Sequence, residues 1–315
     1  MVESDDESER RVIWKWGRCV VSFVTVFLSQ FALFMLPCFF PNSSLFILLC
    51  FSAIVTLAVA GFGRCCKRLL GFRASAPAFV FFNILFIWGV YIAVIRPVIS
   101  LLVDIVFNAE IVLLVIGLYS IVSSDPGYIT YGSSCLDDVV DGTITDVEAY
   151  SESPVSAWRI RYCRHCKAYV KGFDHHCPAF GNCIGSDDLC QENHVLFIIL
   201  LIGFVTAEAS YVLCSSQFAT KSQIFDISRW ETSKKLAIST MLFSLLQMLW
   251  QGVFLTWHIY CVCFNIRTDE WINWKRYPEF QLINQSQPGE TINHMRFRNP
   301  YDKGILCNIK EFLAP

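Results

Sequence analysis

Charge is scarce in this sequence. Only 17% of the 315 residues are Asp, Glu, Lys or Arg, whereas about 25% is usual for a soluble domain. The net charge is −2 at pH 7, so the chain lacks a basic excess for binding nucleic acid, and we expect no nucleic-acid partner. Internal repeats and extended low-complexity segments are also missing. Because 54% of the residues are hydrophobic, the composition excludes an ordinary soluble protein and indicates a membrane protein.

The N-terminus lacks the basic start of a cleavable signal peptide. Residues 1–18 begin with five acidic side chains and then turn basic and aromatic, and a long hydrophobic run follows. We interpret 1–18 as a disordered cytosolic tail before a membrane anchor. The 15 cysteines are scattered through hydrophobic segments, which favours a reducing compartment over a disulfide framework.

Six hydrophobic segments are long enough to cross a bilayer, for which about 20 residues suffice. They cover 19–40, 44–63, 76–95, 99–122, 194–214 and 236–264. The fourth is the weakest because it contains Asp104 and Glu110, but about 20 residues remain if Asp104 lies in the bend after Pro97. The pattern predicts an all-α polytopic membrane protein with about six transmembrane helices and a short lumenal loop at 215–235.

The distribution of basic residues indicates the orientation. A cytosolic N-terminus places 20 of the 25 Lys and Arg residues on the cytosolic side, in agreement with the positive-inside rule. We therefore expect five regions: a cytosolic tail (1–18), four transmembrane helices (19–122), a small cytosolic zinc-binding cysteine-rich domain (123–192), two transmembrane helices (193–264) and a cytosolic C-terminal region (265–315).

Four cysteines and three histidines gather in the polar interval 163–185. Cys163 and Cys166 have the two-residue gap that lets both sulfurs bind one ion from a single turn, and His176 and Cys183 supply two more ligands. Four ligands of this kind complete a closed tetrahedral Cys3His zinc site. Because a closed site has no open position for water or substrate, we expect one zinc ion with a structural role.

Asp174, His175 and Cys177 remain outside that ligand set. A thiol becomes a good nucleophile when an adjacent base or positive charge stabilises its thiolate, and a carboxylate can orient the base. Since His176 and Cys183 flank Cys177 in the sequence, a bound zinc ion would also fix the backbone that carries the nucleophile.

At these residues the chain resembles the DHHC cysteine-rich domain of the protein S-acyltransferases, or palmitoyltransferases. The resemblance covers two segments: Asp174-His175-His176-Cys177-Pro178 and Asn182-Cys183-Ile184-Gly185. It implies that Cys177 accepts an acyl chain from acyl-CoA, that His175 is the base, that Asp174 orients His175 and that His176 binds zinc.

Three further segments resemble family motifs in the same order: Asp125-Pro126-Gly127, Arg267-Thr268-Asp269-Glu270 and Asn299-Pro300-Tyr301-Asp302-Lys303-Gly304. The second has arginine in place of the first threonine of a TTxE motif. We expect these segments to support the active-site domain, and we leave them out of the catalytic set.

The chain also departs from the family pattern. Family members usually bind two zinc ions, but 151–160 has no cysteine, and Tyr162 and Tyr169 stand where a histidine and a cysteine of the second site would be. One zinc site is therefore expected to be lost. Ala179-Phe180 replaces a tryptophan, about five extra residues surround Cys190, and four predicted spans, where two are typical, precede the domain.

The resemblance implies a protein-cysteine S-palmitoyltransferase. Long-chain acyl-CoA, such as palmitoyl-CoA, would be the co-substrate, and cysteine-containing membrane-associated proteins would be the acceptors. The bilayer would be that of endomembranes (Golgi or ER) or the plasma membrane, with the active site facing the cytosol. Two alternatives remain: a catalytically inactive zinc-bearing membrane adaptor, and a transporter or channel.

Glu208 and His258 lie inside predicted spans, where burial of ionisable groups is costly. Both are functional candidates, although hydrogen bonding within the helix bundle is the favoured explanation.

Overall fold

The computed structural model describes residues 2–70, 74–129, 159–185, 193–220, 227–283 and 295–313. The chain divides into two compact units. The first comprises Met1–Tyr119, Pro178–Gly181 and Leu200–Val253, and the second comprises Ser120–Cys177, Asn182–Ile199 and Phe254–Pro315.

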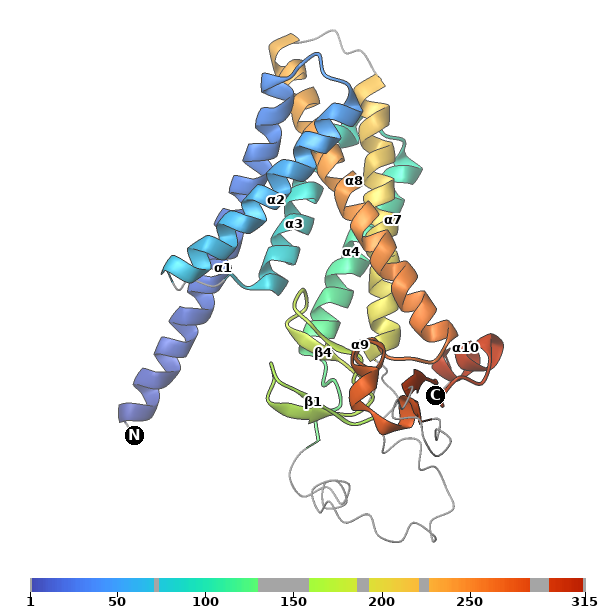
Figure 1. The fold of residues 1–315 in the computed structure, drawn as a ribbon. Helices are drawn as coiled ribbons and strands as arrows, with labels where there is room; N and C mark the ends of the chain where they lie inside the picture. Colours follow the sequence, from blue (N-terminus) through green and yellow to red (C-terminus); the bar gives the residue numbers. More distant parts are fainter. Residues whose placement is uncertain are drawn as a thin grey trace. The chain divides into compact units, whose positions relative to one another are not determined.

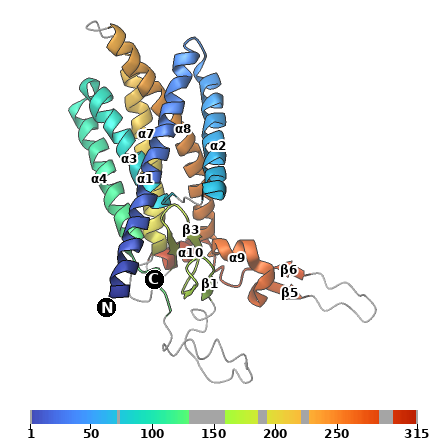
Figure 2. The same cartoon turned by 90° about the vertical axis from the view of Figure 1, so that its left-hand side faces the viewer.

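The first unit is built from long helices (Figures 1 and 2). They are α1 (Val2–Phe39), α2 (Leu45–Leu70), α3 (Ala76–Val90), most of α4 (Leu101–Ser123), and the larger parts of α7 (Asn193–Thr220) and α8 (Ile227–Cys263). Within the described residues, six segments are long and apolar enough to span a membrane: Trp14–Phe39, Leu45–Cys65, Ala76–Val98, Leu101–Ser123, Asn193–Thr220 and Trp230–Cys263. The predicted all-α polytopic fold with six transmembrane helices is confirmed.

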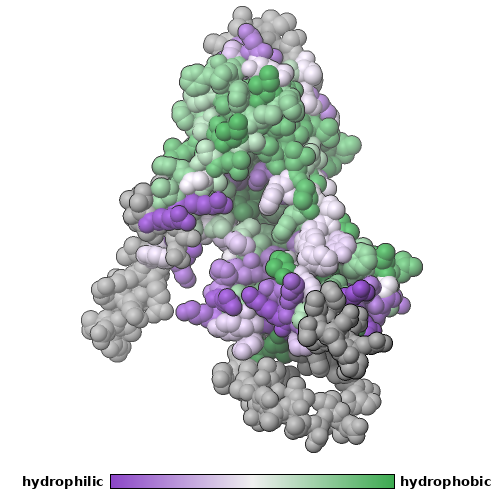
Figure 3. Space-filling model, in the orientation of Figure 1, coloured by the Kyte–Doolittle hydropathy of each residue, from purple (hydrophilic) through white to green (hydrophobic). Residues whose placement is uncertain are grey.

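Helix α1 packs against both α2 and α3. Phe23 and Phe27 of α1 contact Phe82 and Phe86 of α3 edge to face, with ring centroids 5.3 and 5.7 Å apart. Aromatic rings fill such helix contacts with large apolar surfaces in a preferred geometry. Figure 3 shows that hydrophobic side chains cover most of the visible surface of the helices of this unit, as lipid-facing surfaces require.

The bend between α3 and α4 precedes Asp104. A π-turn, Tyr91–Ile95, and a 3-10 turn, Arg96–Val98, form the bend around Pro97. Asp104 does not lie in it but in the first turn of α4, where the helix dipole favours a negative charge. Tyr91 and Arg96 donate hydrogen bonds of 3.1 Å to its two oxygens. These two hydrogen bonds offset the cost of burying the Asp104 carboxylate within a membrane-spanning segment.

Two expectations were wrong. The segment 1–18, predicted to be disordered, is helical from Val2 onward as the start of α1. The predicted loop 215–235 is largely helical too, because α7 continues to Thr220 and α8 begins at Ile227. Helices can continue beyond the bilayer when their outer turns are polar.

Among its described residues, the second unit contains three short antiparallel hairpins, two short α-helices and the ends of α4, α7 and α8. The strands pair as β1 (Arg161–Cys163) with β2 (Ala168–Val170), β3 (His175–Cys177) with β4 (Asn182–Ile184), and β5 (Gln281–Ile283) with β6 (Met295–Phe297). The helices are α9 (Thr268–Asn273) and α10 (Ile305–Leu313). Parts of the predicted domain 123–192, including the insert around Cys190, lie outside the described residues.

Candidate active site and metal centre

Strand β3 presents neighbouring residues to opposite faces of its hairpin. Successive side chains of a strand alternate, so His175 and Cys177 share one face and His176 takes the other. The register pairs His176 with Cys183 of β4, which puts these two side chains together. The three-residue strand thus directs His176 to one face of the hairpin, and His175 and Cys177 to the other.

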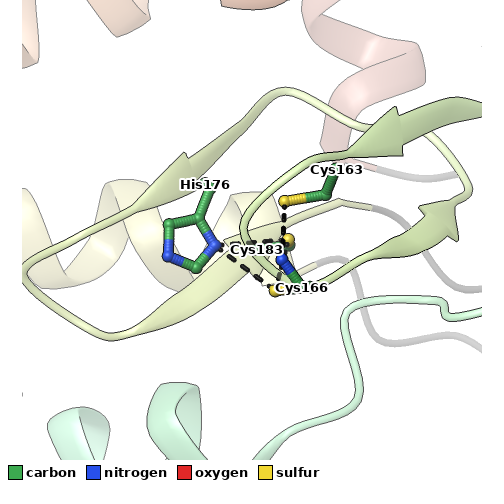
Figure 4. A group of neighbouring side chains, drawn as sticks. All are labelled: Cys163, Cys166, His176 and Cys183. Atoms are coloured by element: carbon green, nitrogen blue, oxygen red, sulfur yellow. Dashed lines mark hydrogen bonds between the residues drawn. The ribbon is translucent and has the colours of Figure 1, made fainter.

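Four side chains form the sulfur cluster: Cys163, Cys166, His176 and Cys183 (Figure 4). The Sγ of Cys166 lies 3.4 Å from the Sγ of Cys183 and 3.4 Å from Nδ1 of His176. All four ligand atoms lie within 4.8 Å of one another. Three sulfurs and one imidazole nitrogen at such spacings suit tetrahedral zinc, with Nδ1 as the imidazole ligand. The structure therefore brings together all four residues that the sequence proposed as zinc ligands.

Local backbone geometry closes the cluster. The N–H of Cys166 points to the Sγ of Cys163 at 3.4 Å, as in a tight turn between two ligands. Lys167, the next residue, has φ of +55°, a left-handed conformation that reverses the chain into β2. Burial and the neighbouring sulfurs raise the pKa of the Cys183 thiol. The thiols of the cluster therefore ionise together readily only when a cation lies between them.

Tyr128 is a neighbour of the cluster that sequence reasoning missed. It follows Asp125-Pro126-Gly127 and bridges to Val170 of β2. Burial, a hydrogen bond with Cys166 and the charges of the cysteines raise the pKa of its phenol. A phenol O–H beside a thiolate is an outer contact of the kind that orients metal ligands.

Asp174 and His175 form the hydrogen-bonded pair on the other face. The Nδ1 of His175 lies 2.7 Å from Oδ2 of Asp174, whose side chain is 0% exposed. Burial by itself raises the pKa of Asp174, but His194, His175 and His258 together lower it well below its ordinary range. Burial lowers the pKa of His175, but its interactions with Asp174 and Cys177 raise it to about 9. Cys177 is buried beside this pair.

Helix α9 supplies backbone donors to Asp174. The N–H of Thr268 donates to Oδ1 at 2.9 Å, and the N–H of Asp269 donates to the Asp174 carbonyl at 2.9 Å. Glu270 folds back to accept the N–H of Arg267 at 2.9 Å, which caps the same helix. The segment that resembled a TTxE motif thus holds the aspartate by its backbone.

Two histidines near Asp174 were not predicted as site residues. Nε2 of His194 lies 4.0 Å from Oδ1, and Nδ1 of His258 lies 3.9 Å from Oδ2. The only signal for His258 was its place inside a hydrophobic span, and His194 gave none. Bundle hydrogen bonding, the favoured explanation for His258, is not observed, since both ring nitrogens lack a hydrogen-bond partner among the described residues.

The segments 125–127 and 299–304, which also resemble family motifs, contact the β1–β2 hairpin and the residues next to it. The Oδ1 of Asp125 accepts the N–H groups of Gly127 and Tyr128 at 2.9 and 3.0 Å, forming a turn whose Gly127 carbonyl accepts the N–H of Lys171. Tyr301, from the C-terminal segment, is buried under the guanidinium of Arg159, 3.9 Å from its ring centroid.

Arg159 is a further connection that sequence reasoning missed. Its guanidinium lies 3.3 Å from Glu270 and donates 2.8 and 2.7 Å hydrogen bonds to Asn265. It therefore links the chain just before β1 to the cap of α9. Tyr162 and Tyr169, at the positions of the expected lost zinc site, face each other across β1 and β2 with ring centroids 5.2 Å apart.

Comparison with known proteins agrees with this geometry. Residues 154–275 match the family described as DHHC palmitoyltransferase. Palmitoyltransferase ZDHHC17 of Mus musculus is 26% identical over 159 residues, 49% of this chain and 24% of that protein. Palmitoyltransferase ZDHHC12 of Homo sapiens is 27% identical over 224 residues, 64% of this chain and 72% of the relative. Palmitoyltransferase AKR1 of Mortierella alpina is 25% identical over 186 residues, 50% of this chain and 31% of the relative.

The chain spans about a quarter of the length of its ZDHHC17 relatives and most of the length of ZDHHC12. The family match covers the described residues 159–185, the helices α7 and α8, and α9. It thus includes both faces of the β3 and β4 hairpin.

Proposed function

Because residues 154–275 match the DHHC palmitoyltransferase family, we propose that the protein is a protein-cysteine S-palmitoyltransferase. It moves a palmitoyl or other long-chain acyl group from acyl-CoA to cysteines of membrane-associated proteins. The single observation that carries the proposal is the 2.7 Å contact of buried Asp174 with His175 on the face that also holds Cys177. A thiol, a base and an orienting carboxylate in this order are the parts that thioester exchange needs.

In the first step, the Nε2 of His175 accepts the proton of the Cys177 thiol. The Nδ1–H of His175 donates a hydrogen bond to Oδ2 of Asp174, so Nε2 is the ring nitrogen that exchanges a proton with Cys177. The Cys177 thiolate attacks the thioester carbonyl carbon, the bond between that carbon and the CoA sulfur breaks, and the CoA thiolate recovers the proton from His175. The product is a Cys177 acyl-enzyme and free CoA.

In the second step, an acceptor cysteine gives its proton to His175 and attacks the acyl-enzyme. The acyl chain leaves on the acceptor, and Cys177 recovers the proton. Both steps exchange one thioester for another, so no ATP or redox cofactor enters the balance. The sulfur cluster would hold one zinc ion, whose contribution is to fix β3 and β4 and not to react.

A location in the bilayer favours binding of the acyl chain of acyl-CoA. A long acyl chain gains about 0.8 kcal/mol for each CH2 that leaves water, so a membrane-embedded enzyme can hold the chain while CoA stays in the aqueous phase. We place the active site on the cytosolic side, because the positive-inside rule puts 123–192 and 265–315 there. Golgi, ER and plasma membranes are the proposed locations.

The test is acyl-enzyme formation. The purified chain and a Cys177→Ser variant are incubated with labelled palmitoyl-CoA and then with neutral hydroxylamine, which cleaves thioesters. We expect hydroxylamine-sensitive label on the natural chain and none on the variant, with equal zinc content in both.

Label that persists in Cys177→Ser would show that another cysteine reacts. An absence of label on a zinc-loaded, folded chain would contradict the proposal and favour the inactive adaptor. A transporter would instead show solute flux in proteoliposomes, and the sulfur cluster gives that alternative no support.

A further inference from the structure

His258 is a buried histidine without a structural explanation. Its side chain is 0% exposed, and neither Nδ1 nor Nε2 has a hydrogen-bond partner among the described residues. An unpaired buried polar group destabilises the folded state. In native proteins such groups call for a reason, and an unfilled ligand role is one of them.

His258 shares an oxygen with the Asp174 and His175 pair. Its Nδ1 lies 3.9 Å from Oδ2 of Asp174, and Nδ1 of His175 lies 2.7 Å from the same oxygen. One ligand atom from each of the three residues lies within 4.8 Å of the other two. Two ligands on a tetrahedral zinc ion are about 3.4 Å apart, a separation that falls between the two observed distances. Small rotations of these side chains would place all three atoms around one cation.

Aromatic rings hold the histidines in place. The ring of His258 contacts Phe254 and Phe197 at centroid distances of 4.7 and 4.8 Å, and Phe197 also contacts His175 at 5.3 Å. An apolar wall restricts solvent and fixes ring orientation around a metal. The side chain of His175 is 18% exposed, which leaves a way in for a small ion.

We propose that Asp174, His175 and His258 form a second metal site, for a zinc-like divalent cation, and that its occupation reversibly inhibits acyl transfer. Two imidazoles and one carboxylate are a common ligand set for first-row divalent metals. Three protein ligands leave an open position, unlike the closed sulfur cluster. The site is therefore expected to bind more weakly and to release its ion to a mild chelator. The inhibitory part rests on the proposed function, whereas the binding part does not.

The chemistry of the imidazole explains the inhibition. A metal at Nδ1 of His175 leaves the remaining ring proton on Nε2, the nitrogen that must accept the proton of Cys177. The Nε2–H group is a donor and has no lone pair to offer. Acyl-enzyme formation then stops until the ion leaves.

The experiment uses the full-length chain loaded with one zinc ion, to which excess zinc is added. Bound metal is counted after equilibrium dialysis, and acyl-enzyme formation from palmitoyl-CoA is measured with and without the added zinc. We expect two ions per chain and at least a tenfold loss of rate, restored by a mild chelator that leaves the first ion bound. His258→Phe and His258→Gln should each keep one ion, and their own rates should fall less than twofold on adding zinc.

His194→Gln is the matched control. His194 is also buried, but it lies 4.0 Å from the other oxygen of Asp174 and is not one of the three ligands. This variant should still bind two ions.

The outcomes separate the two proposals. A natural chain that forms acyl-enzyme but binds only one ion overturns the second site and leaves the proposed function intact. Equal zinc inhibition in both His258 variants overturns it too, since the inhibitory ion then binds elsewhere. Loss of the second ion only in the His258 variants supports the site, even if no chain forms acyl-enzyme, which would instead contradict the proposed function.

Discussion

The sulfur cluster and the set formed by Asp174, His175 and Cys177 occupy opposite faces of one hairpin, yet they are assembled differently. All four residues of the cluster come from the β1–β2 and β3–β4 hairpins, within 21 residues of the chain. Asp174 instead receives backbone donors from α9 and has histidines of α7 and α8 beside it. Local spacing thus suffices for the metal ligands, whereas the electrostatic setting of the other face depends on helices distant in sequence.

Removing a zinc ligand should have the largest effect. In Cys166→Ala the cluster loses one of three sulfurs, and zinc binding can supply about 10 kcal/mol or more to a small metal-dependent domain. We expect zinc content near zero, a strongly lowered thermal unfolding temperature and no acyl-enzyme. Cys177→Ser should keep one zinc ion and an unchanged unfolding temperature. If Cys177→Ser also released zinc, zinc binding by the sulfur cluster would not be independent of the face that carries Cys177.

Removing the proposed base, His175, should lower the rate without releasing zinc. General base catalysis contributes about 10²–10⁴-fold, so His175→Gln should lower the rate of acyl-enzyme formation by that factor while zinc content stays at one. His165→Gln is the matched control, because His165 stacks on His176 with centroids 4.8 Å apart and is not in the sulfur cluster. We expect it to lower the rate less than threefold, and a larger loss would argue against His175 as the specific base.

A substitution of Gly185 tests how closely the end of the β3–β4 hairpin packs against Pro126 and Lys171. A Cβ at this position would lie 2.5 Å from the Pro126 carbonyl oxygen and 2.8 Å from that of Lys171. Overpacking of this kind costs about 1–3 kcal/mol, so Gly185→Ala should unfold at a lower temperature and release zinc faster to a chelator. Gly89→Ala, with nothing within 4 Å, should not be destabilised. Equal behaviour of the two variants would contradict the close contact.

The smallest effect concerns pH. The pKa of His175 is raised from 6.5 to about 9 in the folded protein. A raised pKa means that the contribution to stability is complete below about pH 6.5 and is lost as pH rises through about 9. The unfolding temperature of the natural chain minus that of His175→Phe should therefore fall over this interval. A difference that grew with pH would contradict the assigned pairing with Asp174.

The hydrophobic segments determined the fold class, because about 20 apolar residues can be accommodated only as spanning helices. The ends of these helices were less predictable. Residues 1–18 and 215–220 were predicted as a tail and part of a loop, yet both stretches are helical, because a helix can extend past the most hydrophobic part of its sequence. The sequence left open whether Asp104 lies in the bend after Pro97; it lies in α4, where Tyr91 and Arg96 donate hydrogen bonds to it.

The sequence by itself identified the four residues of the sulfur cluster and the neighbouring set of Asp174, His175 and Cys177, because a two-residue cysteine gap and strand alternation are local properties. The roles of these residues stay predictions. Only the tertiary structure decided what surrounds Asp174: the N–H of Thr268 and the imidazoles of His194 and His258. The physical reason is that the orientation and the pKa of a buried carboxylate depend on the donors that the fold brings within a few ångströms. Separation along the sequence does not reveal which donors these are.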